Sequence, residues 1–157
     1  ILAGKHGFGR IDMIEDRVVG IKSREIYETP GLLLLIKAHQ ELESITLSPE
    51  VIEFKDFVEK KWSQLVYQGF WFGPLKQALD SFIESTQKNV NGVVKIQLFK
   101  GNAIILGRAS SNNSLYREDL ATYSHEDSFN HENAKGFIYM WGMANKIWAE
   151  SNLKDIQ

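Results

Sequence analysis

The chain has 157 residues, 43% of them hydrophobic and 24% charged, so it is long and apolar enough to bury a sizeable core in one domain. Its formal net charge of −2 excludes a general attraction to nucleic acid or anionic membranes, and the lack of cysteine excludes disulfides and thiolate metal sites. The longest apolar run, residues 32–36, is far shorter than the roughly 20 residues that span a bilayer, so we expect a cytoplasmic protein with no nucleic-acid or membrane partner.

The first segment predicts a β-hairpin. Residues 8–14 alternate between two faces with a period of two, 15–17 have turn chemistry, and 18–27 continue as a second extended segment. The chain opens with ILAGKHGFGR and has no initiator Met. We therefore expect it to be a piece of a longer protein.

Three helices should follow, after residues 30–31 end the hairpin. Apolar residues recur at spacings of three and four over 32–45, and 48–50 read as an N-cap, a first-turn proline and an acid that start a second helix. That helix should end near residue 69, and a third should cover 74–88. The residues expected to face inward are Leu35, Ala38, His39, Leu42 and Ile45, then Val51, Phe54, Val58, Trp62 and Leu65, then Leu75, Ala78, Leu79, Phe82 and Ile83.

The remaining predicted elements are strands at 93–99 and 103–107 joined by a turn at 100–102, a short element at 115–123, a loop at 124–133, and a helix at 134–153. Hairpins and helices alternate along the chain. This order predicts an α+β fold in which antiparallel hairpins pack against several helices, with a helix at the C-terminus.

The final helix carries a broad apolar face. Its members are Phe137, Met140, Trp141, Ala144, Ile147 and Trp148. The helix either docks on its own domain or buries these rings in a partner. Gly136 and Gly142 each cost a helix about 1 kcal/mol relative to alanine, which suggests that a close backbone approach compensates.

Residue chemistry alone gives no complete active site, and we expect no catalytic residue in the chain. His39 is a lone histidine near an apolar face, where a structural role is more common than that of a base or ligand. His125 and His131 share a loop with several acids, but their spacing is irregular, so we expect no metal site. The glycine-rich residues 4–9 lead into no strand-to-helix turn and therefore predict no phosphate cradle.

The charged ribbon at residues 14–31 has two interpretations. It is either a solvated hairpin face with surface ion pairs, or a site for a zwitterionic amino acid, whose ammonium needs a carboxylate and whose carboxylate needs donors. Glu15 should lie at the turn end of the hairpin. Tyr27 should lie far along the return strand unless the chain bends, which Gly20 permits.

Longer motifs add a resemblance. The stretch GFGRIDMIEDRVVGIKSREIYETPG at 7–31 resembles a signature of the argininosuccinate synthase family. The further stretches that resemble the family, in the same order, are KAHQELESITL at 37–47, LVYQGFWFGPL at 65–75, LFKGNAIILGR at 98–108, SLYREDLATY at 114–123 and NAKGFIYMWGM at 133–143. The resemblance covers nearly the whole chain.

The resemblance implies an ATP-dependent ligase that joins citrulline to aspartate in arginine biosynthesis, with Mg²⁺ accompanying the ATP. It implies that Glu15 and Tyr27 hold citrulline. Lys22, Ser23 and Arg24 match the signature too, and they either contact substrate or tie the hairpin to a neighbouring subunit through Glu28 or another acid. The alternative function is a stand-alone oligomerisation module without catalysis.

The resemblance also implies a domain organisation. Residues 1–130 correspond to the C-terminal part of the synthetase domain, and 131–157 to a multimerisation helix. We expect the family's N-terminal nucleotide-binding domain to lie outside this chain. A homotetramer is implied, with Phe137, Trp141 and Trp148 in the interface.

Overall fold

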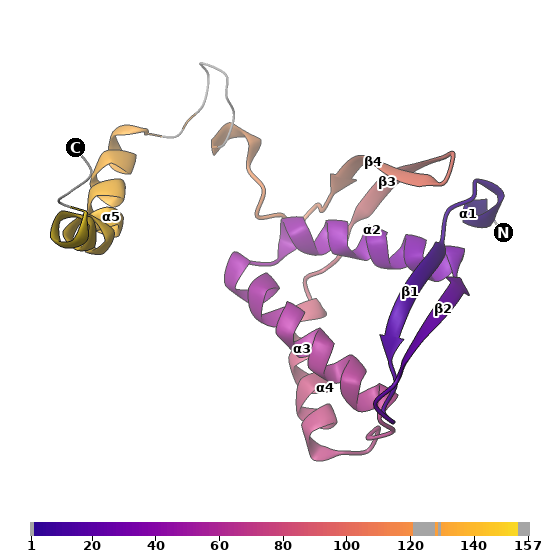
Figure 1. The fold of residues 1–157 in the computed structure, drawn as a ribbon. Helices are drawn as coiled ribbons and strands as arrows, with labels where there is room; N and C mark the ends of the chain where they lie inside the picture. Colours follow the sequence, from indigo (N-terminus) through magenta and orange to yellow (C-terminus); the bar gives the residue numbers. More distant parts are fainter. Residues whose placement is uncertain (1, 121–127, 129, 154–157) are drawn as a thin grey trace. The chain divides into compact units, whose positions relative to one another are not determined.

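The computed structural model describes residues 2–120, 128 and 130–153. The chain divides into two compact units, Ile1–Tyr116 (unit 1) and Arg117–Gln157 (unit 2). Unit 1 contains two antiparallel hairpins and several helices, and unit 2 ends in a long helix (Figure 1). The predicted α+β class with a C-terminal helix is confirmed.

The elements of unit 1 are, in chain order, α1 (Leu2–Lys5), β1 (Arg10–Asp16), β2 (Lys22–Glu28), α2 (Pro30–Thr46), α3 (Pro49–Tyr67), α4 (Pro74–Gln87), β3 (Val93–Phe99) and β4 (Asn102–Ala109). The three predicted helices and both hairpins are present. Helix α1 was not predicted, because four residues are too few to show a period.

The first hairpin turns later than predicted. A turn at 15–17 is wrong, because the Gly20 N–H donates to the Arg17 carbonyl at 2.9 Å and the Arg17 N–H donates to the Ile21 carbonyl at 2.8 Å. Gly20 has a φ of +86°, a left-handed conformation that glycine adopts at little cost. The conformational freedom of Gly20 thus fixes the position of the turn. Because the turn comes later than residue 17, Glu15 lies inside β1.

An N-terminal segment ties the two hairpins to α2. The Thr29 N–H donates to the Gly9 carbonyl at 2.9 Å, and the Gly101 N–H donates to the His6 carbonyl at 2.6 Å. Gly9 has a φ of +98°, and a Cβ atom there would lie 2.2 Å from the Pro30 Cα. Pro30 begins α2 against this glycine, in the first helical turn where proline is well tolerated.

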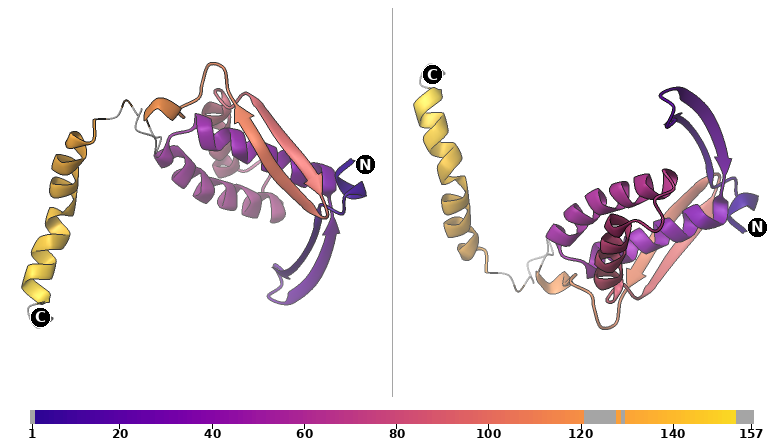
Figure 2. Two further views of the ribbon diagram at one scale, coloured as in Figure 1. Left: turned by 90° about the horizontal axis from the view of Figure 1, so that it is seen from above. Right: turned by 90° about the horizontal axis from the view of Figure 1, so that it is seen from below.

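Helix α2 crosses the middle of unit 1, with β3 and β4 on one side and the α3–α4 pair on the other (Figures 1 and 2). The predicted turn of the second hairpin is confirmed, since Lys100 and Gly101 have φ values of 45° and 80° between the paired strands. Leu106 has no partner in β3, which marks a β-bulge.

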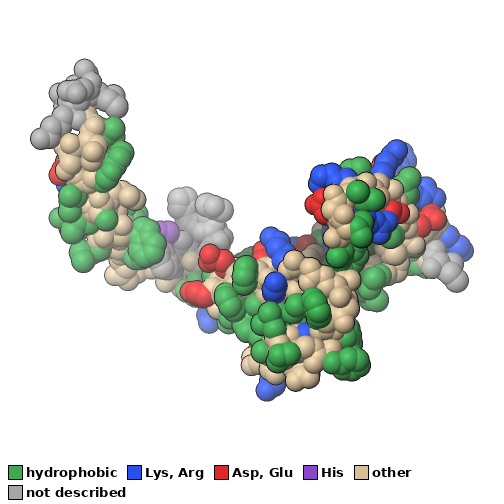
Figure 3. Space-filling view, turned by 60° about the horizontal axis from the view of Figure 1, so that its bottom comes forward, with side chains coloured by type: hydrophobic (Ala, Val, Ile, Leu, Met, Phe, Trp, Pro, Cys, Tyr) green, Lys and Arg blue, Asp and Glu red, His purple; other side chains and the backbone are tan. Residues whose placement is uncertain are grey.

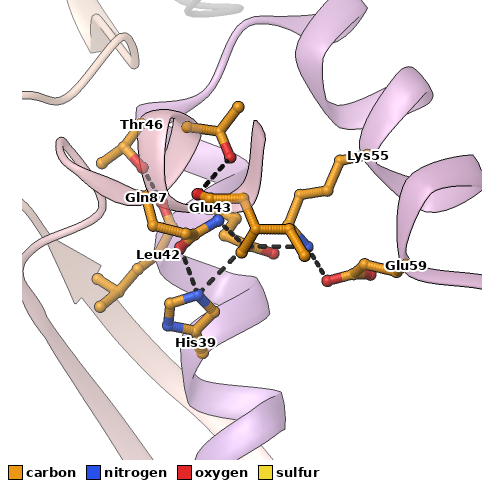
Figure 4. Close-up of polar contacts among 9 residues, drawn as sticks. His39, Leu42, Glu43, Thr46, Lys55, Glu59 and Gln87 are labelled. Carbon is orange, nitrogen blue, oxygen red and sulfur yellow. Dashed lines mark hydrogen bonds and ion pairs between the residues drawn. The ribbon is translucent and has the colours of Figure 1, made fainter. Parts of the chain in front are cut away.

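A buried polar network joins α2, α3 and α4 (Figure 4). Glu43 and Lys55 are each 6% exposed, and the Lys55 Nζ lies 3.0 Å from the Glu43 Oε1. The Gln87 amide donates to this carboxylate at 2.7 Å, and its oxygen lies 2.7 Å from the His39 Nε2. Burial opposes the charged form of Lys55, but hydrogen bonds to Glu59 and Glu43 outweigh it and raise the pKa of Lys55.

Few apolar side chains are buried among the described residues. The buried ones are Ala3, Leu47, Val58, Leu65 and Ala103. Of the residues predicted to face inward, Val58 and Leu65 are buried, whereas Leu35 is 69% and Phe54 56% exposed. Hydrophobic side chains are accordingly common at the surface (Figure 3). The expected sizeable core is therefore wrong for the part of the chain described, because a period identifies an apolar stripe without showing what covers it.

Unit 2 contains the 3₁₀-helix η1 (Glu118–Leu120) and α5 (Glu132–Asn152). Arg117 pairs with Asp119 at 2.8 Å, and the Ser128 hydroxyl donates to the Asp119 carbonyl at 2.8 Å. Residues 121–127, within the predicted short element and loop, lie outside the described part. None of the described helices combines the length and apolar character needed to cross a membrane.

Gly9→Ala should lower the free energy of unfolding by about 3 kcal/mol or more, because a methyl group would meet the Pro30 backbone while φ stays positive. Gly20→Ala is the matched control. It also has a positive φ but no atom within 4 Å of the new Cβ, so only about 1–2 kcal/mol should be lost. Urea unfolding measures both, and equal losses would contradict the proposed clash.

Glu43→Gln should lower the free energy of unfolding by roughly 1–3 kcal/mol near pH 8, because it weakens the support of a buried ammonium. The raised pKa of Lys55 means that its contribution is complete below the ordinary value of 10.5 and is lost as the pH rises through the folded-state pKa. The gap between parent and variant should therefore shrink in unfolding experiments above about pH 10.5. Glu53→Gln, at an exposed position of α3, is the control and should show no such gap.

Candidate functional site

The first hairpin has an exposed outer face, made of Arg10, Asp12, Asp16, Lys22, Arg24 and Glu28. The Arg10 Nε donates to Glu28 at 2.9 Å, and the Arg24 Nε donates to Asp12 at 2.8 Å. Lys22 pairs with Asp16, and every one of these side chains is more than half exposed. Such surface pairs contribute little to stability. The solvated-face interpretation of the charged ribbon is confirmed for this face.

The opposite, inner face carries Glu15, Arg17, Ser23, Glu25 and Tyr27, which alternation along the paired strands places on one side. The Tyr27 hydroxyl donates a hydrogen bond to the Glu15 carboxylate. Glu15 lies opposite Ser23, so the Tyr27 backbone is four residues, or about 13 Å, further along. The two long side chains meet across this separation, and the structure brings both predicted site residues together.

Arg17 lies at the centre of the inner face. Its Nε donates to the Ser23 Oγ at 2.7 Å, and its Nη2 donates to the Glu25 carboxylate. Its Nη1 lies 3.6 Å from the Glu15 Oε2, beyond hydrogen-bonding distance. The guanidinium therefore hydrogen-bonds Glu25 and makes only a longer ion pair with Glu15. Its pKa is raised, first by its polar contact with the Tyr67 side chain and then by Glu25.

An open depression of about 420 Å³ lies beside the inner face. Glu15, Arg17 and Tyr27 line it from the hairpin, and Tyr67, the last residue of α3, lines it from the helix. The charged side chains that line it, Glu15, Asp16 and Arg17, sum to one negative charge. The depression thus suits a ligand that presents one cationic group.

The Tyr27 phenol remains a donor at neutral pH. Its pKa is raised, first by the hydrogen bond to Glu15, then by burial and by the charges of Glu15 and Glu25. A carboxylate offers about four lone-pair positions, so this single phenolic donor leaves Glu15 with acceptor capacity for a ligand.

Sequence reasoning did not identify Arg17, Glu25 or Tyr67 as site residues. The strand alternation could have placed the first two beside Glu15 once the turn was positioned correctly. Tyr67 gave no such signal, because only the fold brings the end of α3 to the hairpin. Of the residues left without a role, Lys22 and Arg24 belong to the outer face, and Ser23 accepts from Arg17.

The other candidates give no further site. His39 is exposed at the edge of the network, where it contacts Gln87 and Glu43; it does not face inward as expected, but its role is structural, as predicted. His125 lies outside the described residues. Within the residues that are described, no group of three or more His, Asp or Glu side chains is placed to hold a metal ion. Residues 4–9 lead from α1 into β1, a helix-to-strand passage and not a strand-to-helix turn.

The residues expected at an oligomer interface share one stripe of α5. Phe137, Trp141 and Trp148 are 61%, 78% and 60% exposed, and the Phe137 and Trp141 rings stack with centroids 5.5 Å apart. No residue of α5 is buried. Lys135 pairs with Glu132 elsewhere on the helix. Helix α5 therefore has an apolar stripe and a separate charged side. Within the described residues of unit 2, no side chain covers the apolar stripe.

Comparison with known proteins identifies the family. The family model for the arginosuccinate synthase C-terminal domain matches residues 1–148. Argininosuccinate synthase of Prochlorococcus marinus (strain AS9601) is 81% identical over 153 residues, which are 98% of this chain and 38% of that protein. The argininosuccinate synthase of Prochlorococcus marinus (strain MIT 9301) is 80% identical over 154 residues with the same coverage. That of Prochlorococcus marinus (strain MIT 9211) is 67% identical over 153 residues, again 98% of this chain and 38% of the relative.

The chain thus spans about 38% of the length of these relatives. Its match to the family model extends over nearly all of its residues. The chain belongs to the argininosuccinate synthase family, in which it corresponds to the C-terminal domain.

Proposed function

We propose that this chain is the citrulline-holding and assembly part of an argininosuccinate synthase. The complete enzyme joins citrulline to aspartate with ATP, giving argininosuccinate, AMP and pyrophosphate. The ureido oxygen of citrulline is adenylated, and the aspartate amine then displaces AMP. This chain contributes binding and orientation of citrulline, which bring the ureido group to the activating machinery.

The observation that carries the proposal is the hydrogen-bonded pair of Glu15 and Tyr27 at an open depression with one net negative charge. Citrulline has an α-ammonium and a neutral ureido group. Glu15 receives the ammonium, because its carboxylate makes only a long, 3.6 Å ion pair with Arg17 and retains acceptor positions for hydrogen bonds. Tyr27 holds this carboxylate in place and offers its hydroxyl to the polar end of the substrate.

ATP, its Mg²⁺ and aspartate are assigned to parts of the enzyme beyond this chain, consistent with relatives in which the matched region is 38% of the length. ATP with its Mg²⁺ needs a phosphate cradle and metal ligands, and the described residues offer neither a glycine-rich strand-to-helix turn nor a group of three or more side chains placed to hold a metal ion. Glu15 and Tyr27 therefore act on citrulline alone.

The C-terminal helix makes the assembly contact in this proposal. The stripe of Phe137, Trp141 and Trp148 resembles the aromatic centre of an interface, and it is uncovered within the described part of unit 2. A homotetramer, in which each copy covers the helix of another, accounts for this exposure.

Glu15→Gln in the full-length synthase that carries this chain should weaken citrulline binding roughly 10- to 100-fold, because a charge-assisted hydrogen bond to the ammonium is lost. Isothermal titration with citrulline measures the change. Asp12→Asn is the control, since it removes the same charge from the outer face of the same strand. Unchanged affinity of the Glu15 variant would refute the assignment.

Trp141→Ser should shift the full-length protein from tetramer towards smaller species in sedimentation velocity, because a central aromatic anchor is removed. Tyr139→Ser is the matched control. Tyr139 is 63% exposed but lies about 160° around the helix from Trp141, so its loss should leave the assembly intact. A tetramer that persists in both variants would exclude the α5 stripe as the interface.

A further inference from the structure

Arg17 lies between two carboxylates and is bonded to only one of them. Its Nη2 binds Glu25, whereas its Nη1 stays 3.6 Å from the Glu15 Oε2. Both acids are on the inner face, and both are partly shielded from solvent, with side-chain exposures of 31% for Glu25 and 18% for Glu15. A rotation of the guanidinium towards Glu15 would convert this 3.6 Å ion pair into a hydrogen-bonded one.

The guanidinium is held in its present orientation by more than one contact. The Ser23 Oγ accepts from Nε at 2.7 Å, and Glu25 accepts from Nη2. These two acceptors occupy one edge of the planar fork. The edge towards Glu15 makes no hydrogen bond to it, and Tyr27 is the donor that Glu15 uses instead.

We propose that Glu25 is a positioning residue that keeps Arg17 from hydrogen-bonding Glu15 and so preserves the acceptor positions of the Glu15 carboxylate for the substrate ammonium. The inference rests on the proposed role of Glu15 in binding citrulline. Glu25 touches no substrate in this arrangement. It acts by competing with Glu15 for the one cation of the inner face.

Removal of the Glu25 charge should weaken citrulline binding. In Glu25→Gln, Arg17 loses its charged partner, and Glu15 becomes the nearest carboxylate available to it. Citrulline must then displace Arg17 from Glu15 before its ammonium binds. The net charge of the inner face also rises from −1 to 0, which weakens attraction of a cation.

The first experiment is steady-state kinetics of the full-length Glu25→Gln synthase, followed by pyrophosphate release. The KM for citrulline should rise about tenfold, equivalent to about 1.4 kcal/mol, while kcat and the KM values for aspartate and ATP stay within about twofold. Glu28→Gln, on the outer face of the same strand, should leave all of these values unchanged. An unchanged KM for citrulline in Glu25→Gln would overturn the proposal.

A double-variant cycle with Arg17→Met distinguishes competition from a simple structural loss. In the Arg17→Met background there is no cation to release, so adding Glu25→Gln should no longer raise the KM for citrulline. A further tenfold rise in that background would overturn the proposal. Glu25→Asp keeps the charge and should retain most of the citrulline affinity in the presence of Arg17, which provides a test that does not depend on the folding of the Arg17 variant.

Glu15→Gln separates failure of this inference from failure of the proposed function. If Glu15→Gln weakens citrulline binding while Glu25→Gln does not, Glu15 binds substrate but Glu25 does not position Arg17. If neither change affects citrulline, the proposed role of Glu15 is itself wrong, and the role of Glu25 falls with it. Loss in both, with the loss from Glu25→Gln absent in the Arg17→Met background, supports both proposals.

Discussion

The strand register of the first hairpin is the constraint on which the candidate site depends. With Glu15 opposite Ser23, Glu15, Glu25 and Tyr27 share one face of the hairpin, and the charged side chains of the other face form a ladder of exposed ion pairs. A shift by one residue would exchange the two faces and carry Glu15 and Tyr27 to solvent. The positive φ of Gly20 sets this register, because it places the turn. Gly20, although it has no side chain, thus determines which charged side chains of the hairpin face a ligand.

Charge is divided unevenly between the two faces. On the outer face each acid has its own base, so those groups balance locally and remain solvated. On the inner face one base stands between two acids, and the imbalance leaves a carboxylate with spare acceptor capacity. Binding capacity therefore arises from incomplete pairing, whereas complete pairing gives only a solvated surface.

Unit 1 is organised by polar contacts as much as by apolar burial. The ion pair of Lys55 and Glu43, with Gln87 attached, links helices whose apolar stripes are partly open to solvent. Buried charges tolerate little displacement because each needs its partner at short range. Such a network can keep α3 in place relative to the hairpin, and it is α3 that brings Tyr67 to the depression. The α5 stripe extends the same pattern of uncovered apolar surface to unit 2.

The sequence by itself determined the local elements and the family. Periods of two and about 3.6, first-turn prolines and the second hairpin's turn are consequences of backbone and side-chain preferences within a few residues, so they can be read without the fold. The family's motifs also pointed to Glu15 and Tyr27. Only the tertiary structure decided that Arg17 hydrogen-bonds Glu25 and makes a longer ion pair with Glu15, that Tyr67 reaches the hairpin, and that Leu35 and Phe54 remain exposed. These outcomes depend on distances between segments remote in the chain and on which atoms compete for one partner, and neither quantity is encoded in a local pattern.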